Sequence, residues 1–378
     1  MFLMYFHLII TDDCNLCCSY CRAKVFEDTD EAGWGAPEIG IDDRLPADLA
    51  VDLGQLYGFL SQDPGVTLTF YGGEPLIRAD LIEQIVNTAP VKRFMLQTNG
   101  LLLHQLDPAV TNRFATILVS LDGKESLTDA NRGEGVYRAV MENIRDLRSN
   151  GFTGELIARM TVTERTDIVD EVRFLAENPD HSFSSIHWQL DANFTHDFSR
   201  RRFREWAEQS YNPGICTLAG EWVRQMEETG TVRRWYPFLD PMEDLLKKRD
   251  SLLRCGAGHA NYAIMTDGHI APCPVMIGMS GYYVGHIAES CPTGLPRVEI
   301  AGECLSCDIR AFCGGRCLYA AIMQPWEPAA RQIVCGTVRN LHDVLTGVLP
   351  SVQALIAEGA ITRADFAHEK FNGCEIIP

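Results

Sequence analysis

The stretch that decides the fold is Met1 to Cys21, MFLMYFHLIITDDCNLCCSYC, in which an apolar run leads directly into closely spaced cysteines. The apolar residues Met1 to Ile10 predict a buried strand, and Cys14, Cys18 and Cys21 follow it with CxxxCxxC spacing. Three thiolates can hold three corners of a 4Fe-4S cube and leave the fourth iron for a ligand from outside the protein. Taken alone, the spacing also fits a zinc knuckle or buried structural cysteines, so further motifs must decide.

The pattern of an apolar strand that ends in polar residues recurs along the first half of the chain. Further strands are predicted at 66–70, 93–98, 117–121, 156–162 and 185–190. Between them, apolar residues recur at helical spacing, as in Leu49, Leu53, Leu56 and Leu60 or Val136, Val140, Ile144 and Leu147. This alternation predicts an α/β fold, a partial (β/α)6 barrel of TIM type that ends near residue 205, with ligand-binding residues at the strand C-termini.

The strand ends carry a second set of motifs. The strand 66–70 runs into the GGEP turn of Gly72, Gly73 and Glu74, and later strands end in QTNG and SLDG. Together with CxxxCxxC and the aromatic Tyr20 before its last cysteine, these motifs resemble the radical S-adenosylmethionine (SAM) superfamily. The resemblance implies a 4Fe-4S cluster on the three cysteines, whose open iron is chelated by SAM.

The same resemblance suggests which residues bind SAM. Gly72, Gly73 and Glu74 are expected to hold its methionine end. Asn99, Ser120 and Arg159 are candidates for its ribose and carboxylate, because they lie at or near strands; Asn99 and Ser120 fit equally well as strand-end caps. No catalytic residue is assigned. His187, Gln189 and Asp191, at the end of the sixth strand, are candidate substrate contacts or structural residues.

Length, composition and charge narrow the class of protein. A chain of 378 residues suits two domains with connectors, and a hydrophobic content of 46% allows a sizeable core. No stretch approaches the roughly 18 consecutive apolar residues of a membrane span, and the first ten residues lack the basic region of a signal peptide. The net charge of -18 argues against nucleic acid. We therefore expect a cytoplasmic protein without nucleic-acid or membrane partners.

The fourteen cysteines are unevenly distributed, since nine of them lie between Cys216 and Cys335. Disulfides are rare in a reducing compartment, so this density predicts metal ligation. One part has the form Cx12Gx4C, followed by CxxCx5CxxxC and a final cysteine. This resembles the SPASM domain of radical SAM enzymes that modify peptides and proteins. The residues of the pattern are Cys255, Gly268, Cys273, Cys304, Cys307, Cys313, Cys317 and Cys335.

The resemblance to SPASM domains implies two auxiliary 4Fe-4S clusters, and hence three clusters in all. The outer one would be bound by Cys304, Cys307, Cys313 and Cys335, and the inner one by Cys255, Cys273 and Cys317. The inner cluster is then one ligand short, with either an open iron or a ligand from outside the pattern. His259, Cys216, Cys291 and Cys374 are the candidates for that ligand, and Cys17 is expected to be a bystander.

These observations predict three regions. Residues 1–205 form the barrel, 206–253 a helical linker, and 254–378 the SPASM domain with a C-terminal helical tail. The linker is expected to contain a helix from Phe203 to Glu228, a turn around Pro237 and Pro241, and a short helix from Met242. Residues 261–272 predict a β-hairpin that turns at Asp267 and Gly268, with a short strand at 284–287.

The resemblance implies an enzyme that cleaves SAM to a 5'-deoxyadenosyl radical with an electron from a flavodoxin or ferredoxin. Its expected substrate is a peptide or protein, as in RiPP maturation. The enzyme is expected to modify this substrate by thioether formation, another cross-link or epimerisation. The acid-base aspartate of the sulfatase-maturating relatives follows the second SPASM cysteine, where this chain has Pro274, so formylglycine formation is not expected. A radical SAM enzyme for a small metabolite is the alternative; a non-catalytic iron-sulfur carrier fits the GGEP turn poorly.

Overall fold

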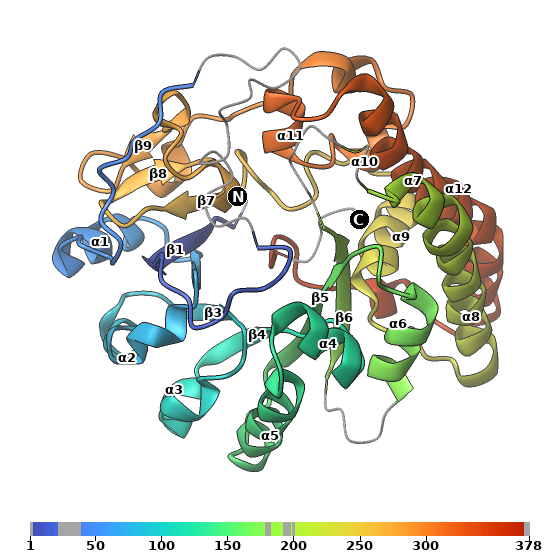
Figure 1. Cartoon of the computed structure of the whole chain (residues 1–378), viewed down its shortest axis with the longest axis horizontal. Coiled ribbons are helices and arrows are strands. Elements are labelled where there is room, and N and C mark those ends of the chain that lie inside the picture. Colours follow the sequence, from blue (N-terminus) through green and yellow to red (C-terminus); the bar gives the residue numbers. More distant parts are fainter. Residues whose placement is uncertain (1–2, 22–38, 178–182, 192–197, 199–200, 374–378) are drawn as a thin grey trace.

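The computed structural model of the protein describes residues 3–21, 39–177, 183–191, 198 and 201–373. Its centre is a sheet with strand order β6-β5-β4-β3-β2-β1-β7-β8-β9. The first six strands are Tyr5–Thr11 (β1), Thr67–Gly72 (β2), Arg93–Thr98 (β3), Phe114–Ser120 (β4), Glu155–Val162 (β5) and Ser185–Leu190 (β6). Each pairs in parallel with the next. The predicted fold class is thus confirmed, and Figure 1 shows the strands as an arc.

Helices cover the outside of this arc (Figure 1). They are Leu53–Leu60 (α1), Ala79–Thr88 (α2), Pro108–Thr111 (α3), Glu125–Arg132 (α4), Val136–Ser149 (α5) and Ile168–Glu177 (α6). Helix α1 begins four residues after Leu49, because the Asp52 side chain caps it by accepting the N–H of Gln55. Leu49 instead donates its backbone N–H to Ile10 of β1, at 2.9 Å.

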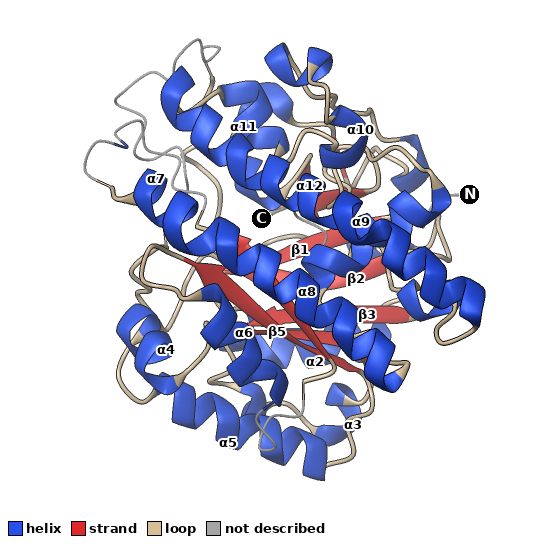
Figure 2. Ribbon diagram, turned by 90° about the vertical axis from the view of Figure 1, so that its right-hand side faces the viewer, coloured by secondary structure: helices blue, strands red, loops and turns tan. Residues whose placement is uncertain are grey.

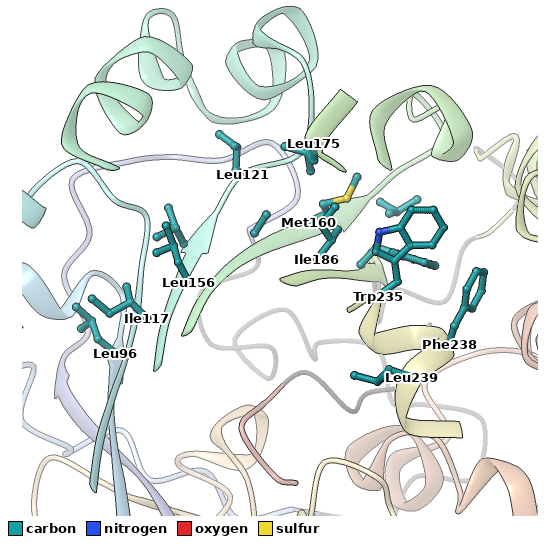
Figure 3. Packing of buried hydrophobic residues seen from close by; sticks show 14 of the residues in the cluster. Leu96, Ile117, Leu121, Leu156, Met160, Leu175, Ile186, Trp235, Phe238 and Leu239 are labelled. Atoms are coloured by element: carbon teal, nitrogen blue, oxygen red, sulfur yellow. The ribbon is translucent and has the colours of Figure 1, made fainter. Parts of the chain in front are cut away.

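Alternate residues of each strand face opposite sides of the sheet. One set is apolar and packs in the main core with the covering helices, and Figure 3 shows Leu96, Ile117, Leu156, Met160 and Ile186 in this cluster. The other set lines the inside of the barrel. Its apolar members Tyr5, Met95, Leu118 and Ile157 form a separate small cluster with Tyr236, the first residue of a later helix, and Phe371 packs against this cluster.

The segment after β6 is more helical than the sequence predicted. Helix Phe203–Trp206 (α7), a π-helical turn at 207–211 and helix Asn212–Thr229 (α8) follow one another without a break, and a further helix spans Tyr236–Lys247 (α9). The predicted turn around Pro237 and Pro241 is therefore wrong. Pro237 stands in the first turn of α9, where a missing N–H costs nothing. Pro241 lies inside α9, whose Phe238, Leu239 and Met242 are fully buried, so packing overrides local preference.

The C-terminal half continues the same sheet. Strand Asn261–Ile264 (β7) pairs in parallel with β1, and His269–Ala271 (β8) and Gly285–His286 (β9) follow in antiparallel order. The predicted hairpin and short strand are thus present. They extend the sheet of the barrel, although the predicted helical linker separates them from it in the sequence. Helices Arg310–Cys313 (α10), Leu318–Met323 (α11) and Pro328–Glu358 (α12) complete the chain, with α12 packed on α8 and α9 (Figure 2). The predicted domain boundaries stay a prediction.

After α12 the chain returns to the inside of the barrel. The Phe371 ring meets Tyr5 of β1 at a centroid distance of 5.8 Å, and Asn372 donates a hydrogen bond of 2.7 Å to the Tyr236 hydroxyl. Lys370 forms an ion pair with Asp240 of α9, and the His368 ring lies within hydrogen-bonding distance of the same carboxylate, at 3.1 Å. This tail, residues 367–373, therefore fills the space between β1 and α9. Among the described residues no helix is long and apolar enough to span a bilayer.

Candidate active site

The cysteine loop leaves the carboxyl end of β1 and brings its three predicted ligands together. Burial raises the pKa of the Cys14 and Cys18 thiols, and each also responds to the charge of Cys21. The backbone N–H of Cys21 donates to the carbonyl of Cys18 at 2.9 Å, which closes a tight turn. Cys17 is exposed and takes no part in these interactions.

The GGEP turn at the end of β2 lies directly against this loop. Gly73 donates its N–H to the carbonyl of Thr11 at 2.9 Å, and Glu74 donates to that of Asp13 at 2.8 Å. A Cβ atom on Gly72 would stand 2.2 Å from the Thr11 carbonyl oxygen, and one on Gly73 would stand 2.3 Å from that of Asp13. Glycine is required here because the cysteine loop approaches the turn so closely.

The Glu74 side chain is fully buried and engaged within the protein. Its carboxylate accepts hydrogen bonds from the Thr98 hydroxyl at 2.7 Å, from the Asn99 N–H at 2.6 Å and from the Leu76 N–H at 3.1 Å. Burial raises the pKa of this carboxyl, and the three donors oppose that shift. Glu74 thus ties the end of β2 to the end of β3.

Asn99 and Ser120 lie at the ends of β3 and β4, as predicted. The Asn99 amide donates to the side-chain oxygen of Asn15, inside the cysteine loop, at 2.6 Å. Ser120 pairs in register with Arg159 on β5. The Arg159 side chain points into the barrel, where it donates to Gln97 at 2.5 Å and to Gln189 at 3.1 Å. Asn99 therefore borders the cysteine loop, whereas Arg159 faces other polar residues of the barrel interior.

Sequence reasoning missed a buried anchor of the loop, Asp122, which follows β4. Arg132 of α4 donates to both of its carboxylate oxygens, at 2.8 and 3.1 Å, and neither side chain is more than 5% exposed. The Tyr20 hydroxyl donates to the same carboxylate at 2.9 Å, and its ring lies under the Arg132 guanidinium. The signal was present in SLDG, since Asp122 ends a buried strand, but only the fold shows its partners.

The cysteines of the C-terminal half form two further groups. Burial raises the pKa of the Cys273 thiol, and the charges of Cys317 and Cys255 add to this effect. Burial also raises the pKa of Cys304 to about 11, with contributions from Cys313, Cys335 and Cys307. These are the two sets that the sequence analysis proposed as inner and outer ligands, although residues far apart in the chain make up each set.

The candidates for the fourth ligand of the inner cluster lie at different places in the structure. The His259 ring contacts the Phe371 ring, at a centroid distance of 5.6 Å, and the carbonyl of Ala257. Cys216 is exposed on α8, and exposed Cys291 contacts Thr293. Cys374 lies outside the described residues. No three His, Cys, Asp or Glu side chains within the described ranges converge as around a single metal ion. In a 4Fe-4S cube, by contrast, each thiolate binds its own iron.

Comparisons with known proteins identify the first part of this arrangement. Residues 8–175, which contain the cysteine loop and β1 to β5, match the model of the Radical SAM superfamily. This part of the chain is therefore similar to radical SAM domains. The chain is also 28% identical over 157 residues to the GTP 3',8-cyclase of Alkaliphilus metalliredigens (strain QYMF); this match includes 39% of the present chain and only 44% of that protein.

Solved structures share the fold of nearly the whole chain. A structure of native anSMEcpe with bound AdoMet superposes with a TM-score of 0.67 at 16% identity, over 93% of this chain and 100% of that one. The complex of native anSMEcpe with AdoMet and the Kp18Cys peptide gives a TM-score of 0.67 at 15% identity, over 92% and 98%. The fold of the predicted radical SAM resemblance is thus supported over nearly the whole chain, and the SPASM assignment of the C-terminal cysteines stays a prediction.

Proposed function

We propose that this chain is a radical SAM enzyme that modifies a peptide or protein. One observation carries the proposal: three thiols meet in a loop that packs against the GGEP turn at the strand ends, and two more groups of cysteines meet in the C-terminal half. When bound, a reduced 4Fe-4S cluster supplies the electron that cleaves SAM to a 5'-deoxyadenosyl radical.

The chain's own residues have separate tasks in this proposal. Cys14, Cys18 and Cys21 hold the SAM cluster, and Gly72 and Gly73 allow the loop and its ligand to approach the sheet edge. Asn99 and Ser120 are the proposed SAM contacts at the same edge. The inner group at Cys273 and the outer group at Cys304 hold two auxiliary clusters, in the ligand sets named above. The barrel walls exclude water from the reaction.

A peptide or protein substrate is supported by the SPASM pattern and by the shared fold with anSMEcpe, which has been solved with a bound peptide. We rank thioether formation, other cross-links and epimerisation in that order. Conversion of a sulfatase peptide to formylglycine is disfavoured because Pro274 follows Cys273. The match to GTP 3',8-cyclase keeps a small molecule as the second candidate substrate.

Anaerobic reconstitution tests the radical SAM assignment. The wild type should bind about eleven to twelve irons per chain and release 5'-deoxyadenosine from SAM with a strong reductant. The triple variant C14A/C18A/C21A should lose SAM cleavage and about one cluster, whereas Cys216→Ala, an exposed site on α8, should change neither. SAM cleavage by the triple variant, or zinc in place of iron, would contradict the assignment.

The substrate class is tested by incubating the reconstituted enzyme with SAM and either short peptides encoded beside its gene or GTP. We expect one peptide to be modified, seen as a mass decrease for a cross-link or, in deuterated water, as uptake of one deuterium for epimerisation, without formylglycine and without a GTP product. Conversion of GTP alone would favour the small-molecule alternative.

A further inference from the structure

Arg159 is a charged residue on the inner face of the barrel. It lies on β5, between Ser120 of β4 and His187 of β6 in the register of the sheet. Two of its guanidinium N–H groups are held by the neutral side-chain carbonyls of Gln97 and Gln189, from β3 and β6. Arg159 is partly exposed. The two glutamines fix its direction and leave its other donors available.

The charge of the partly buried Arg159 is balanced differently from that of two fully buried arginines. Arg132 is paired with Asp122 at 2.8 Å, and Arg254 with Asp240 and Asp244 at 2.6 and 2.7 Å. Arg159 has no carboxylate within 4 Å among the residues that the structure describes. A cation withdrawn from water without a counter-ion is costly, so a partner at this position gains more than it would at the surface.

The nearest ionisable groups do not supply a negative charge. Burial and, to a smaller extent, the Arg159 cation lower the pKa of His7 to about 4 against the opposing hydrogen bond to Asn261, so the imidazole is neutral near pH 7. Its Nδ1 donates to the Asn261 side-chain oxygen at 3.0 Å, because the amide nitrogen of Asn261 already donates to two carbonyls. Burial raises the pKa of Tyr71, so its phenol also stays neutral.

We propose that Arg159 binds a carboxylate of the substrate inside the barrel and thereby selects acidic substrates. The inference rests on the proposed function, since it assumes that the barrel holds a substrate. Arginine suits this role because its planar N–H groups match a carboxylate in a bidentate manner.

This assignment differs from the SAM contact expected from the sequence. The other SAM candidates, Gly73 and Asn99, contact the cysteine loop at the strand ends. Arg159 instead faces the tail inside the barrel: a Cβ atom on Gly373 would lie 3.5 Å from its Nη1 and 3.9 Å from Nε2 of His7. The contacts of Arg159 are thus with the barrel interior and the tail, and we assign a carboxylate bound there to the substrate.

Capped amino acids test the inference with the reconstituted full-length protein. The probes are N-acetylglutamate methylamide, which carries a side-chain carboxylate, N-acetylglutamine methylamide, which is neutral, and N-acetylglutamine with a free α-carboxylate. Dissociation constants are measured by ligand-observed NMR, with and without SAM. At least one acid should bind about tenfold or more tightly than the neutral probe. The acid that binds better shows whether the site takes a side-chain or an α-carboxylate.

Variants locate the preference. Arg159→Gln should abolish it, Arg159→Lys should retain part of it, and Arg138→Gln, at a surface arginine that is 79% exposed, should leave it unchanged. Circular dichroism and the SAM dissociation constant should be the same in all four proteins.

Three results would overturn the proposal: equal binding of acids and amide by the wild type, an undiminished preference in Arg159→Gln, or a tenfold loss of SAM affinity in Arg159→Gln. The last would make Arg159 a SAM contact instead. Failure of the wild type to bind SAM would contradict the proposed function. The preference for acids can then still be measured, because the titrations without SAM do not depend on SAM binding.

Discussion

At the scale of single residues, His7 shows how burial sets a protonation state. It stands on β1 with 6% of its surface exposed, and Asn261 holds its Nδ1. The folded pKa of about 4 lies below the ordinary value of 6.5. The native protein therefore resists protonation of this ring, whereas the unfolded chain takes up a proton near pH 6.5.

The sign of the pH dependence follows from this difference. The contribution of neutral His7 is fully present above pH 6.5 and is lost as the pH falls from 6.5 towards 4. We expect the wild type to lose roughly 3 kcal/mol more unfolding free energy over this range than His7→Gln does. Urea unfolding of both proteins at several pH values measures it, with exposed His104→Gln as the control. Parallel pH profiles for the wild type and His7→Gln would contradict the prediction.

At the scale of elements, the cysteine loop is held from two sides. The GGEP turn after β2 bonds to the loop backbone at Thr11 and Asp13. Asp122 after β4 bonds to Tyr20, and Asn131 of α4 accepts the N–H of Ser19 through its carbonyl at 2.8 Å. The position of the three thiols thus depends on elements more than fifty residues away in the chain.

Asp122→Asn should weaken this anchor strongly. The substitution leaves Arg132 buried without its counter-ion, and we expect a loss of about 3–5 kcal/mol in unfolding free energy, together with reduced iron uptake. Tyr20→Phe removes one hydrogen bond and should cost only about 0.5–1.5 kcal/mol. The double variant Asp122→Asn/Arg132→Gln should be more stable than Asp122→Asn alone. Urea unfolding measures the stability of these variants, and iron analysis measures their cluster content. Equal losses of unfolding free energy in Asp122→Asn and Tyr20→Phe would contradict the ion-pair explanation.

At the scale of the whole molecule, the tail connects the barrel with the C-terminal cysteine region. Phe371 packs with Tyr5 and Tyr236, while Lys370 and His368 pair with Asp240. Asp240 in turn holds Arg254, whose guanidinium donates to the carbonyl of Phe312 beside Cys313 at 2.6 Å. One chain of contacts therefore runs from β1 through the tail and α9 to Phe312, next to Cys313 in the sequence.

Phe371→Ala should destabilise this connection. Loss of the ring from a partly buried apolar site should cost about 2 kcal/mol, and Phe371→Leu should cost less than about 1.5 kcal/mol. The Phe371 ring packs against Tyr5 of β1 and Tyr236 of α9. Hydrogen exchange should therefore increase in β1 and in α9 in the alanine variant, and it should change little in the leucine variant. Mass-spectrometric exchange measures this. An increase confined to the tail itself would show that the tail is not part of the core.

The sequence by itself determined the local features of this protein. Apolar residues recur with a period of two in strands and of about 3.6 in helices. The six parallel strands and their helices were therefore predictable within a few residues. The spacing of Cys14, Cys18 and Cys21 and the Asp267–Gly268 turn are likewise set within short segments. Local preference failed at Pro237 and Pro241, because the burial of α9 outweighs the turn tendency of proline.

Only the tertiary structure decided which distant residues meet. It brings Cys273 to Cys317 and Cys255, buries Asp122 against Arg132 and Tyr20, and surrounds Arg159 with neutral groups. It also joins Glu74 to the end of β3 and returns the tail to β1. The physical reason is that such contacts depend on the path of the whole backbone through the sheet, whereas periodicity and spacing report only on neighbours along the chain.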